Sequence, residues 1–265
     1  MIARQVPLSL VQQELLRALR AVDEVCRARE LCYWLDGGTL LGAIRHQGFV
    51  PWDDDIDICL PRKDLNSLLA AAGDLPASVQ LSMGRRAGHA VNAKVLVPTL
   101  LGVPYGMQDE AQNASLPIGI DIIAVDGAVK SARLRRPLSR VARALASRYA
   151  AAERAQASDS ALSRSTWRVL ERTPPRIVHR LQDWLVTAHS IADGELLQYG
   201  IDTAMPDTVF PRNVVLPTKP VDFEGLQFPG PAYAHEYLRI YYGDDFMTPP
   251  VIQRSSHASS FWFSG

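Results

Sequence analysis

The sequence predicts a mixed α/β or α+β protein built around a sheet. Short apolar runs typical of strands alternate with amphipathic segments typical of helices, and no segment repeats at a fixed period. A length of 265 residues with 47% hydrophobic and 21% charged residues is sufficient for a sizeable core. Neither a transmembrane span nor a secretory leader is predicted, and three scattered cysteines favour a reduced, cytoplasmic protein.

The first predicted helix covers residues 9–30. Its apolar side chains recur at intervals of three and four residues, at Leu15, Leu19, Val22 and Cys26. Ser9 and Gln12 have the spacing of a capping box at the start of this helix. We therefore expect a capped helix that packs through one face.

Strands and short helices follow in alternation. Residues 31–35 form an apolar and aromatic run that stops at two glycines, which indicates a buried strand entering a tight turn. Thr39 is in position to cap the short helix that follows. The remaining strands are predicted at residues 55–60, 79–83, 92–97 and 118–125, with a helix at residues 62–72.

A basic helical segment follows these strands. Residues 130–180 hold 13 Lys and Arg against three acidic residues, a local charge of +10 in a chain with 28 of each sign. We predict a core at 1–129, the basic segment at 130–195, and a C-terminal part at 196–265 that packs back on the core. The equal numbers of acidic and basic residues in the whole chain argue against nucleic-acid binding. The basic segment predicts peripheral contact with an anionic membrane, although its charge also simply balances the acidic remainder.

The run Asp53-Asp54-Asp55-Ile56-Asp57 predicts a metal site. Residues two apart on a strand share a face, so Asp55 and Asp57 project together while Ile56 enters the core. Carboxylates this close favour Mg²⁺ or Mn²⁺, with Asp53 as a further ligand and Asp54 facing solvent or capping a turn. An acidic surface loop or a calcium-structuring loop is the alternative interpretation.

Further residues are candidates for the same site. Asp121 stands alone in an apolar strand, where a carboxylate costs several kcal/mol unless it is paired, so we expect a third ligand or a general base; a structural aspartate is the alternative. Glycines at a strand-to-helix turn allow backbone N–H groups to approach phosphate. The predicted substrate-binding residues are Gly37, Gly38, Thr39, Arg45, His46 and Lys94; a packed or surface residue is the alternative for His46, and a strand-edge lysine is the alternative for Lys94.

The segment from Asp36 to Ile58, DGGTLLGAIRHQGFVPWDDDIDI, resembles the signature of the LicD family, to which fukutin and fukutin-related protein are also similar. GIDIIAVDG and YYGDDFMTPP resemble later blocks of that family in the same order. The resemblance implies a nucleotidyltransferase-like mixed sheet flanked by helices, with an added helical segment here. It also implies that Asp55 and Asp57 are the metal pair and that Asp121 is the third acidic position.

The resemblance further implies an activity. Such a protein would use Mg²⁺ to transfer a phospho-alcohol, such as phosphocholine, from a CDP-activated donor to a hydroxyl of a glycan or lipid-linked acceptor, and would release CMP. Two alternatives stay open at this point. One is a nucleotidyltransferase that uses an NTP and releases pyrophosphate, and the other is a non-catalytic binding protein of the same fold.

Overall fold

The computed structural model describes residues 4–84, 92–104, 116–128, 194–200, 207–251 and 258–263, with a few single positions between 133 and 205. The chain divides into two compact units. The first comprises Met1–Ser82, Ala93–Ile122 and Asn213–Gly265, and the second comprises Met83–Asn92 and Ile123–Arg212. The predicted basic segment lies outside the described residues, apart from single positions, so its helices and its membrane contact stay predictions.

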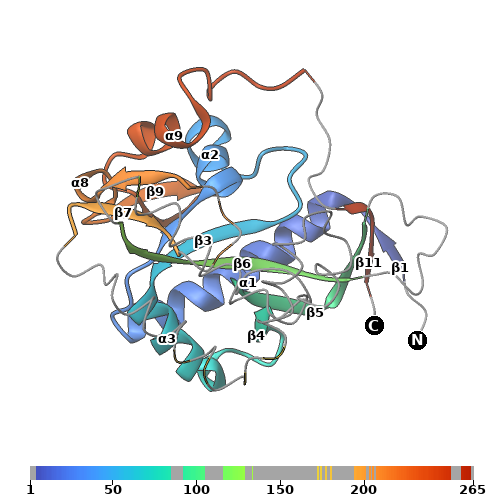
Figure 1. The fold of residues 1–265 in the computed structure, drawn as a ribbon. Coiled ribbons are helices and arrows are strands. Elements are labelled where there is room, and N and C mark those ends of the chain that lie inside the picture. Colours follow the sequence, from blue (N-terminus) through green and yellow to red (C-terminus); the bar gives the residue numbers. More distant parts are fainter. Residues whose placement is uncertain are drawn as a thin grey trace. The chain divides into compact units, whose positions relative to one another are not determined.

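The first unit is built on a sheet with the strand order β1-β11-β5-β6-β3-β2 (Figure 1). β11 is antiparallel to both β1 and β5, β5 is antiparallel to β6, and β3 is antiparallel to β2. The strands are β1 (Arg4–Val6), β2 (Trp34–Leu35), β3 (Ile56–Pro61), β4 (Gln80–Gly84, beside β5), β5 (Asn92–Pro104), β6 (Leu116–Gly127) and β11 (Ala258–Phe263). The predicted α+β class is confirmed, and β5 and β6 are longer than expected.

Helix α1 (Leu8–Ala28) carries the predicted apolar face. Its buried residues are Val11, Leu15, Ala18, Leu19, Val22, Val25 and Cys26. The predicted capping box is wrong, because the helix begins after Pro7 and has no side-chain cap. Gln12 instead donates from Nε2 to the carbonyl oxygen of Asp53 at 3.0 Å. A side chain assigned to local capping thus supports the acidic run 41 residues away.

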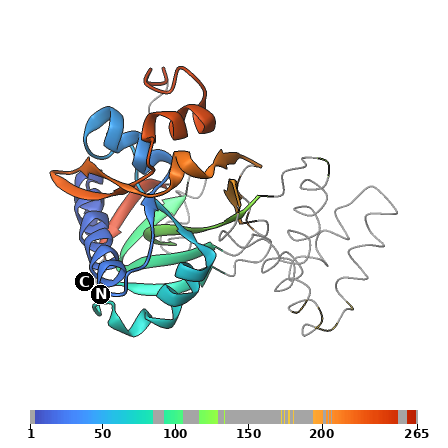
Figure 2. The same cartoon turned by 90° about the vertical axis from the view of Figure 1, so that its left-hand side faces the viewer.

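Helix α2 (Gly37–His46) and helix α9 (Ala234–Tyr242) lie side by side in both ribbon views (Figures 1 and 2). Asp36 is the N-cap residue of α2. The prediction that Thr39 caps this helix is therefore wrong, since Thr39 lies inside its first turn and is buried. After β3 the chain forms α3 (Arg62–Ala70) and a 3₁₀ turn (Ala72–Asp74), close to the predicted 62–72 helix.

A hairpin of β9 (Lys219–Phe223) and β10 (Leu226–Gly230) forms a separate two-stranded sheet. Glu224 at its turn donates its N–H to the Gln47 carbonyl oxygen and accepts the Phe49 N–H at its Oε1, both at 3.0 Å. The rings of Phe49 and Phe223 lie 4.9 Å apart. The C-terminal hairpin therefore fixes the loop that leads into the acidic run; the sequence predicts that this part of the chain packs on the core but does not identify Gln47 and Phe49 as its partners.

The described part of the second unit is a small antiparallel arrangement. The last residues of β6 pair with β7 (Leu196–Tyr199), and β7 pairs with β8 (Val209–Pro211). The rings of Tyr199 and Phe210 meet edge to face with their centroids 5.7 Å apart. The short helix α8 (Arg212–Val215) follows β8, and the chain belongs to the first unit again from Asn213 onward. Within the described parts of both units, no helix has the length and apolarity needed to cross a membrane.

Candidate active site

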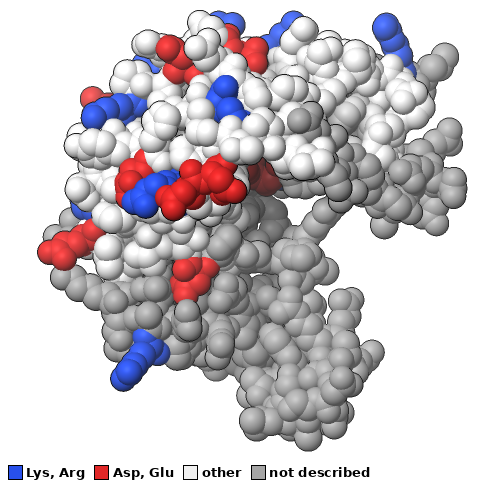
Figure 3. Space-filling view, turned by 90° about the horizontal axis from the view of Figure 1, so that it is seen from above, with Lys and Arg blue, Asp and Glu red and all other residues white. Residues whose placement is uncertain are grey.

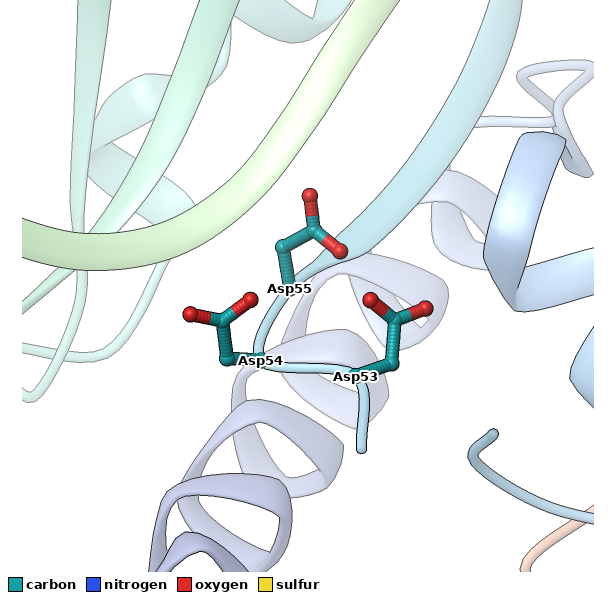
Figure 4. Close-up of side chains that lie close together, drawn as sticks. All are labelled: Asp53, Asp54 and Asp55. Carbon is teal, nitrogen blue, oxygen red and sulfur yellow. The ribbon is translucent and has the colours of Figure 1, made fainter. Parts of the chain in front are cut away.

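The acidic run has the two-faced geometry expected of a strand. Ile56 and Ile58 have no exposed surface, whereas Asp55 and Asp57 are both partly exposed. Figure 4 shows that the carboxylates of Asp53, Asp54 and Asp55 gather where the chain enters β3, above helix α1. The alternation of Asp and Ile therefore places the carboxylates on one face of the strand and the isoleucine side chains in the core, as predicted.

Asp121 joins this surface from the neighbouring strand β6. One carboxylate oxygen from each of Asp55, Asp57 and Asp121 lies within 4.8 Å of the others, and we call these three residues the carboxylate triad. Lys94 is paired with Asp121 across β5 and β6, and its Nζ lies 3.0 Å from Asp121 Oδ2. The predicted proximity of Asp121 is observed; its role as a ligand or base stays a prediction.

Two glycines make room for the carboxylates. A Cβ atom on Gly37 would lie 2.8 Å from Asp57 Oδ2, and one on Gly38 would lie 2.7 Å from Asp53 Oδ2. Gly37 also has a φ of +50°, which is unfavourable for residues with a side chain. The first turn of α2 therefore meets carboxylates directly, and the positive end of the helix dipole stabilises their charge.

Hydrogen bonds to the backbone hold Asp57 in place. The Thr39 hydroxyl accepts the Asp57 N–H at 2.9 Å, and the Asp57 carbonyl oxygen accepts the Asp36 N–H at 3.0 Å. Thr39, which is predicted to bind substrate, is 2% exposed and its hydroxyl binds the strand, so substrate binding by Thr39 stays a prediction. This hydrogen bond holds the backbone of Asp57 in place.

Burial raises the pKa of Asp57 well above its usual value, and the neighbouring carboxylates of Asp55, Asp36, Asp121 and Asp53 raise it further. Like charges at close range disfavour the ionised form of each other. A cation bound at the triad would remove this penalty.

Asp54 differs from the prediction that it faces solvent. It is 2% exposed, and its Oδ2 accepts the backbone N–H of Ala258 at 2.8 Å. This bond joins the acidic run to the start of β11. The side chain therefore has a structural contact at the opposite end of the sequence.

Replacing Asp54 with alanine is expected to lower the free energy of unfolding by about 1–3 kcal/mol, because a buried N–H loses a charged acceptor. The folded variant should keep its triad and its activity to within tenfold. Urea unfolding and activity per folded molecule are the measurements. A variant as stable as wild type would contradict the structural role of Asp54.

The sequence did not indicate the buried pair of Asp36 and Tyr237, which is linked to Asp57 of the triad. The Tyr237 hydroxyl donates to Asp36 Oδ1 at 2.6 Å, and both side chains are almost fully buried. Asp36 thus connects helix α9 to the start of α2 and, through its N–H, to Asp57. Only the fold brings these residues together, since they are 201 positions apart.

Arg45 and His46, predicted to contact phosphate, are engaged with protein groups. Arg45 donates from Nε to His46 Nε2 at 2.9 Å and from Nη1 to the Phe246 carbonyl oxygen at 3.0 Å. Burial lowers the pKa of His46, and the Arg45 charge lowers it further. The neutral imidazole therefore serves as an acceptor here. Phosphate binding by this pair stays a prediction, and the observed contact anchors the chain after α9.

Figure 3 views the molecule from above, onto the side of α2 and α9. Acidic and basic side chains are interspersed on the described part of this face. On α9, Arg239 pairs with Glu236 at 2.6 Å and with Asp244 at 3.5 Å. Such exposed pairs contribute little to stability, and they break up any surface of one charge.

The donor set fits a hard divalent cation. Each member of the triad offers a carboxylate oxygen, which is the ligand type that Mg²⁺ and Mn²⁺ prefer, and the partial exposure of the three side chains leaves room for water or substrate oxygens. Asp53, Asp54 and Asp55 form a second group with oxygens within 4.8 Å. Since Asp54 already accepts a backbone N–H, the triad is the better candidate.

Comparison with known proteins finds a family model that matches the part of the chain containing Asp55 and Asp57. Residues 30–94 match a family model described as "LicD/FKTN/FKRP, nucleotidyltransferase domain". This match includes the acidic run, the two glycines and Lys94. The predicted resemblance to the LicD family is confirmed.

Particular relatives extend the match. The chain is 26% identical to the lipopolysaccharide cholinephosphotransferase LicD of Haemophilus influenzae over 270 residues, which cover 94% of this chain and 96% of the relative. It is 41% identical over 68 residues to the human ribitol 5-phosphate transferase FKRP, a stretch that covers 24% of this chain and 14% of that protein. The first similarity therefore spans nearly the whole chain, and the second is local.

Proposed function

We propose that this protein transfers a phospho-alcohol from a CDP-activated donor to a hydroxyl of a glycan or lipid-linked acceptor, with the help of Mg²⁺ or Mn²⁺. The observation that carries the proposal is the carboxylate triad, whose oxygens lie within 4.8 Å of each other and whose residues Asp55 and Asp57 lie in the segment that matches the LicD family model. A relative that covers the chain is a cholinephosphotransferase, and a second is a ribitol 5-phosphate transferase. Both names describe transfer of a phosphorylated alcohol.

Asp55, Asp57 and Asp121 would hold the cation. When bound, it would neutralise charge on the donor diphosphate, as metal ions do in phosphoryl transfer. Thr39 and Asp36 hold Asp57 by its backbone, and Gly37 and Gly38 allow the first turn of α2 to approach the carboxylates closely. The chain would thus contribute a rigid, pre-arranged set of oxygen ligands, which is the main source of catalysis in this type of reaction.

The proposed reaction is a displacement at phosphorus. An oxygen of the acceptor hydroxyl forms a bond to the phosphorus that carries the alcohol, and the bond from that phosphorus to the bridging oxygen of the diphosphate breaks. CMP leaves with that oxygen. A carboxylate of the site takes up the hydroxyl proton, for which the partly exposed Asp55 and Asp121 are the candidates.

The donor can be identified by stability and product assays. We expect CDP-choline or CDP-ribitol at 100 times its Kd, with Mg²⁺, to stabilise the protein by about 2.7 kcal/mol, seen as a raised melting temperature. With a lipopolysaccharide acceptor that lacks phosphocholine, the active donor should release CMP. CTP should yield no pyrophosphate.

The same assay distinguishes the proposed transfer from the two alternative functions. Pyrophosphate from CTP, with no CMP from either CDP-alcohol, would identify a nucleotidyltransferase instead. Stabilisation by a CDP-alcohol without CMP release, over a series of glycan and lipid-linked acceptors, would identify a binding protein. Each of these outcomes would overturn the proposed transfer.

A further inference from the structure

Lys94 brings a cation to the carboxylate triad from the neighbouring strand. It lies opposite Asp121 in the register of β5 and β6, and its Nζ is 3.0 Å from Asp121 Oδ2. The same carboxylate has an oxygen within 4.8 Å of oxygens of Asp55 and Asp57. The ammonium group therefore supplies positive charge where the triad would otherwise hold anions alone at close range.

This ion pair can break at small cost. The Lys94 side chain is 37% exposed and that of Asp121 is 24% exposed, so water solvates both partners when they separate. Ion pairs with this degree of exposure contribute about 0–1 kcal/mol. A lysine side chain also has several rotatable bonds and can move its charge without movement of the strand. The fold thus places a mobile cation beside a fixed anion.

A divalent cation at the triad and the Lys94 ammonium would compete for Asp121. Both are positive, and at separations of a few ångströms they repel each other. The stronger charge, bound by three carboxylates, would hold the Asp121 oxygens. The ammonium would then lose its partner and would turn toward the nearest available anion.

We infer that Lys94 exchanges partners during the reaction cycle: it neutralises Asp121 when the triad lacks a metal ion, is displaced when a divalent ion binds, and then contacts a phosphate of the donor. The inference rests on the proposed function for its last step. The exchange places two contacts of Lys94 in order: the contact with Asp121 comes before the contact with the donor phosphate. Lys94 substitutes for the metal ion first and binds the donor afterwards.

The exchange is tested by calorimetric titration of the full chain with Mn²⁺. We expect Lys94→Gln to bind Mn²⁺ roughly three- to tenfold more tightly than wild type, because the competing charge is gone. Lys63→Gln is the matched control, since Lys63 is an exposed lysine on α3 and its replacement changes the net charge equally. Its Mn²⁺ affinity should equal that of wild type. Melting temperatures of both variants verify that they fold.

The opposite result would overturn the exchange. If Lys94 only holds Asp121 in position, Lys94→Gln will bind Mn²⁺ more weakly than wild type. An affinity equal to that of Lys63→Gln would also overturn the exchange, because it would mean that no competition occurs. A wild-type protein that binds no Mn²⁺ would overturn both the exchange and the metal of the proposed function.

The last step is measured separately, by binding of CDP-choline at saturating Mn²⁺. We expect Lys94→Gln to bind it at least about tenfold more weakly, and Lys94→Arg to recover most of the affinity, since a charged hydrogen bond to phosphate is lost and restored. Equal affinity of Lys94→Gln and wild type would overturn the donor contact. Failure of wild type to bind CDP-choline or CDP-ribitol would count against the proposed function, while the Mn²⁺ titration still decides the exchange.

Discussion

Replacing Asp57 with asparagine is expected to lower transfer activity at least about a hundredfold, because a fixed charge that acts on the transition state is removed. The metal-free variant should nevertheless be as stable as wild type or more stable. Burial and four neighbouring carboxylates raise the pKa of Asp57, so its charge opposes folding at neutral pH. CMP release and urea unfolding in the presence of a chelator are the two measurements.

Asp55→Asn serves as the companion variant, since Asp55 shares the face of Asp57 and contributes to the same triad. It should also lose activity. Asp222→Asn is a suitable control, because Asp222 is an exposed carboxylate on β9 outside both acidic groups. Activity of Asp57→Asn within tenfold of wild type would contradict its assignment to the metal site.

Gly37→Ala is expected to cause the second large effect, a loss of at least about tenfold in activity together with about 1–2 kcal/mol of stability. The stability term comes from the φ of +50°, which alanine tolerates poorly. The activity term comes from the new Cβ, which would lie 2.8 Å from Asp57 Oδ2 and force that carboxylate to move. Urea unfolding measures the loss of stability, and CMP release measures the loss of activity. Mn²⁺ titration measures whether the displaced carboxylate changes the affinity for the metal ion.

Two other glycines separate these causes. Gly38→Ala would bring a Cβ to 2.7 Å from Asp53 Oδ2, at a residue without positive φ, so it tests crowding of a carboxylate alone. At Gly73 a new Cβ meets no atom within 4 Å, and Gly73→Ala should change stability by less than about 0.5 kcal/mol. If Gly37→Ala behaves like Gly73→Ala, the close fit of α2 to the triad has no functional importance.

Local periodicity predicted those parts of the fold that depend on neighbours in the sequence. The face of α1 follows from apolar residues three and four apart, and the sorting of Asp55 and Ile56 to opposite sides follows from strand alternation. The approach of Asp121 to Asp55 and Asp57 was expected from the cost of burying a lone carboxylate. In each case a rule of local geometry or solvation determines the outcome.

The errors share a different cause, which is contact with residues far away in the sequence. Asp54 was expected to face solvent or cap a turn, yet it binds the N–H of Ala258, 204 positions later. Gln12 was assigned to a capping box, yet it supports Asp53. Thr39 was assigned to a helix end, yet its hydroxyl accepts the N–H of Asp57 from the adjoining strand. Tertiary contacts overrode local preference at each position.

The long-range contacts of the acidic run also determine how late in protein synthesis the site can form. Residues between 36 and 57 depend on Glu224, Tyr237, Phe246 and Ala258, partners that lie 175 to 204 positions later. At a synthesis rate of about 5–20 residues per second, those partners leave the ribosome about 10–40 s after the motif does.

Over that interval the growing chain has its acidic motif but lacks β11, which lies between β1 and β5 in the finished sheet. β5 would present an open edge to other chains, a common starting point for aggregation. A variant that ends at residue 255 would remain in this condition permanently, since it would lack all of β11. Strand β11 is therefore needed at a late stage, because only chains that include it cover this edge of β5 and acquire the contact between Asp54 and Ala258.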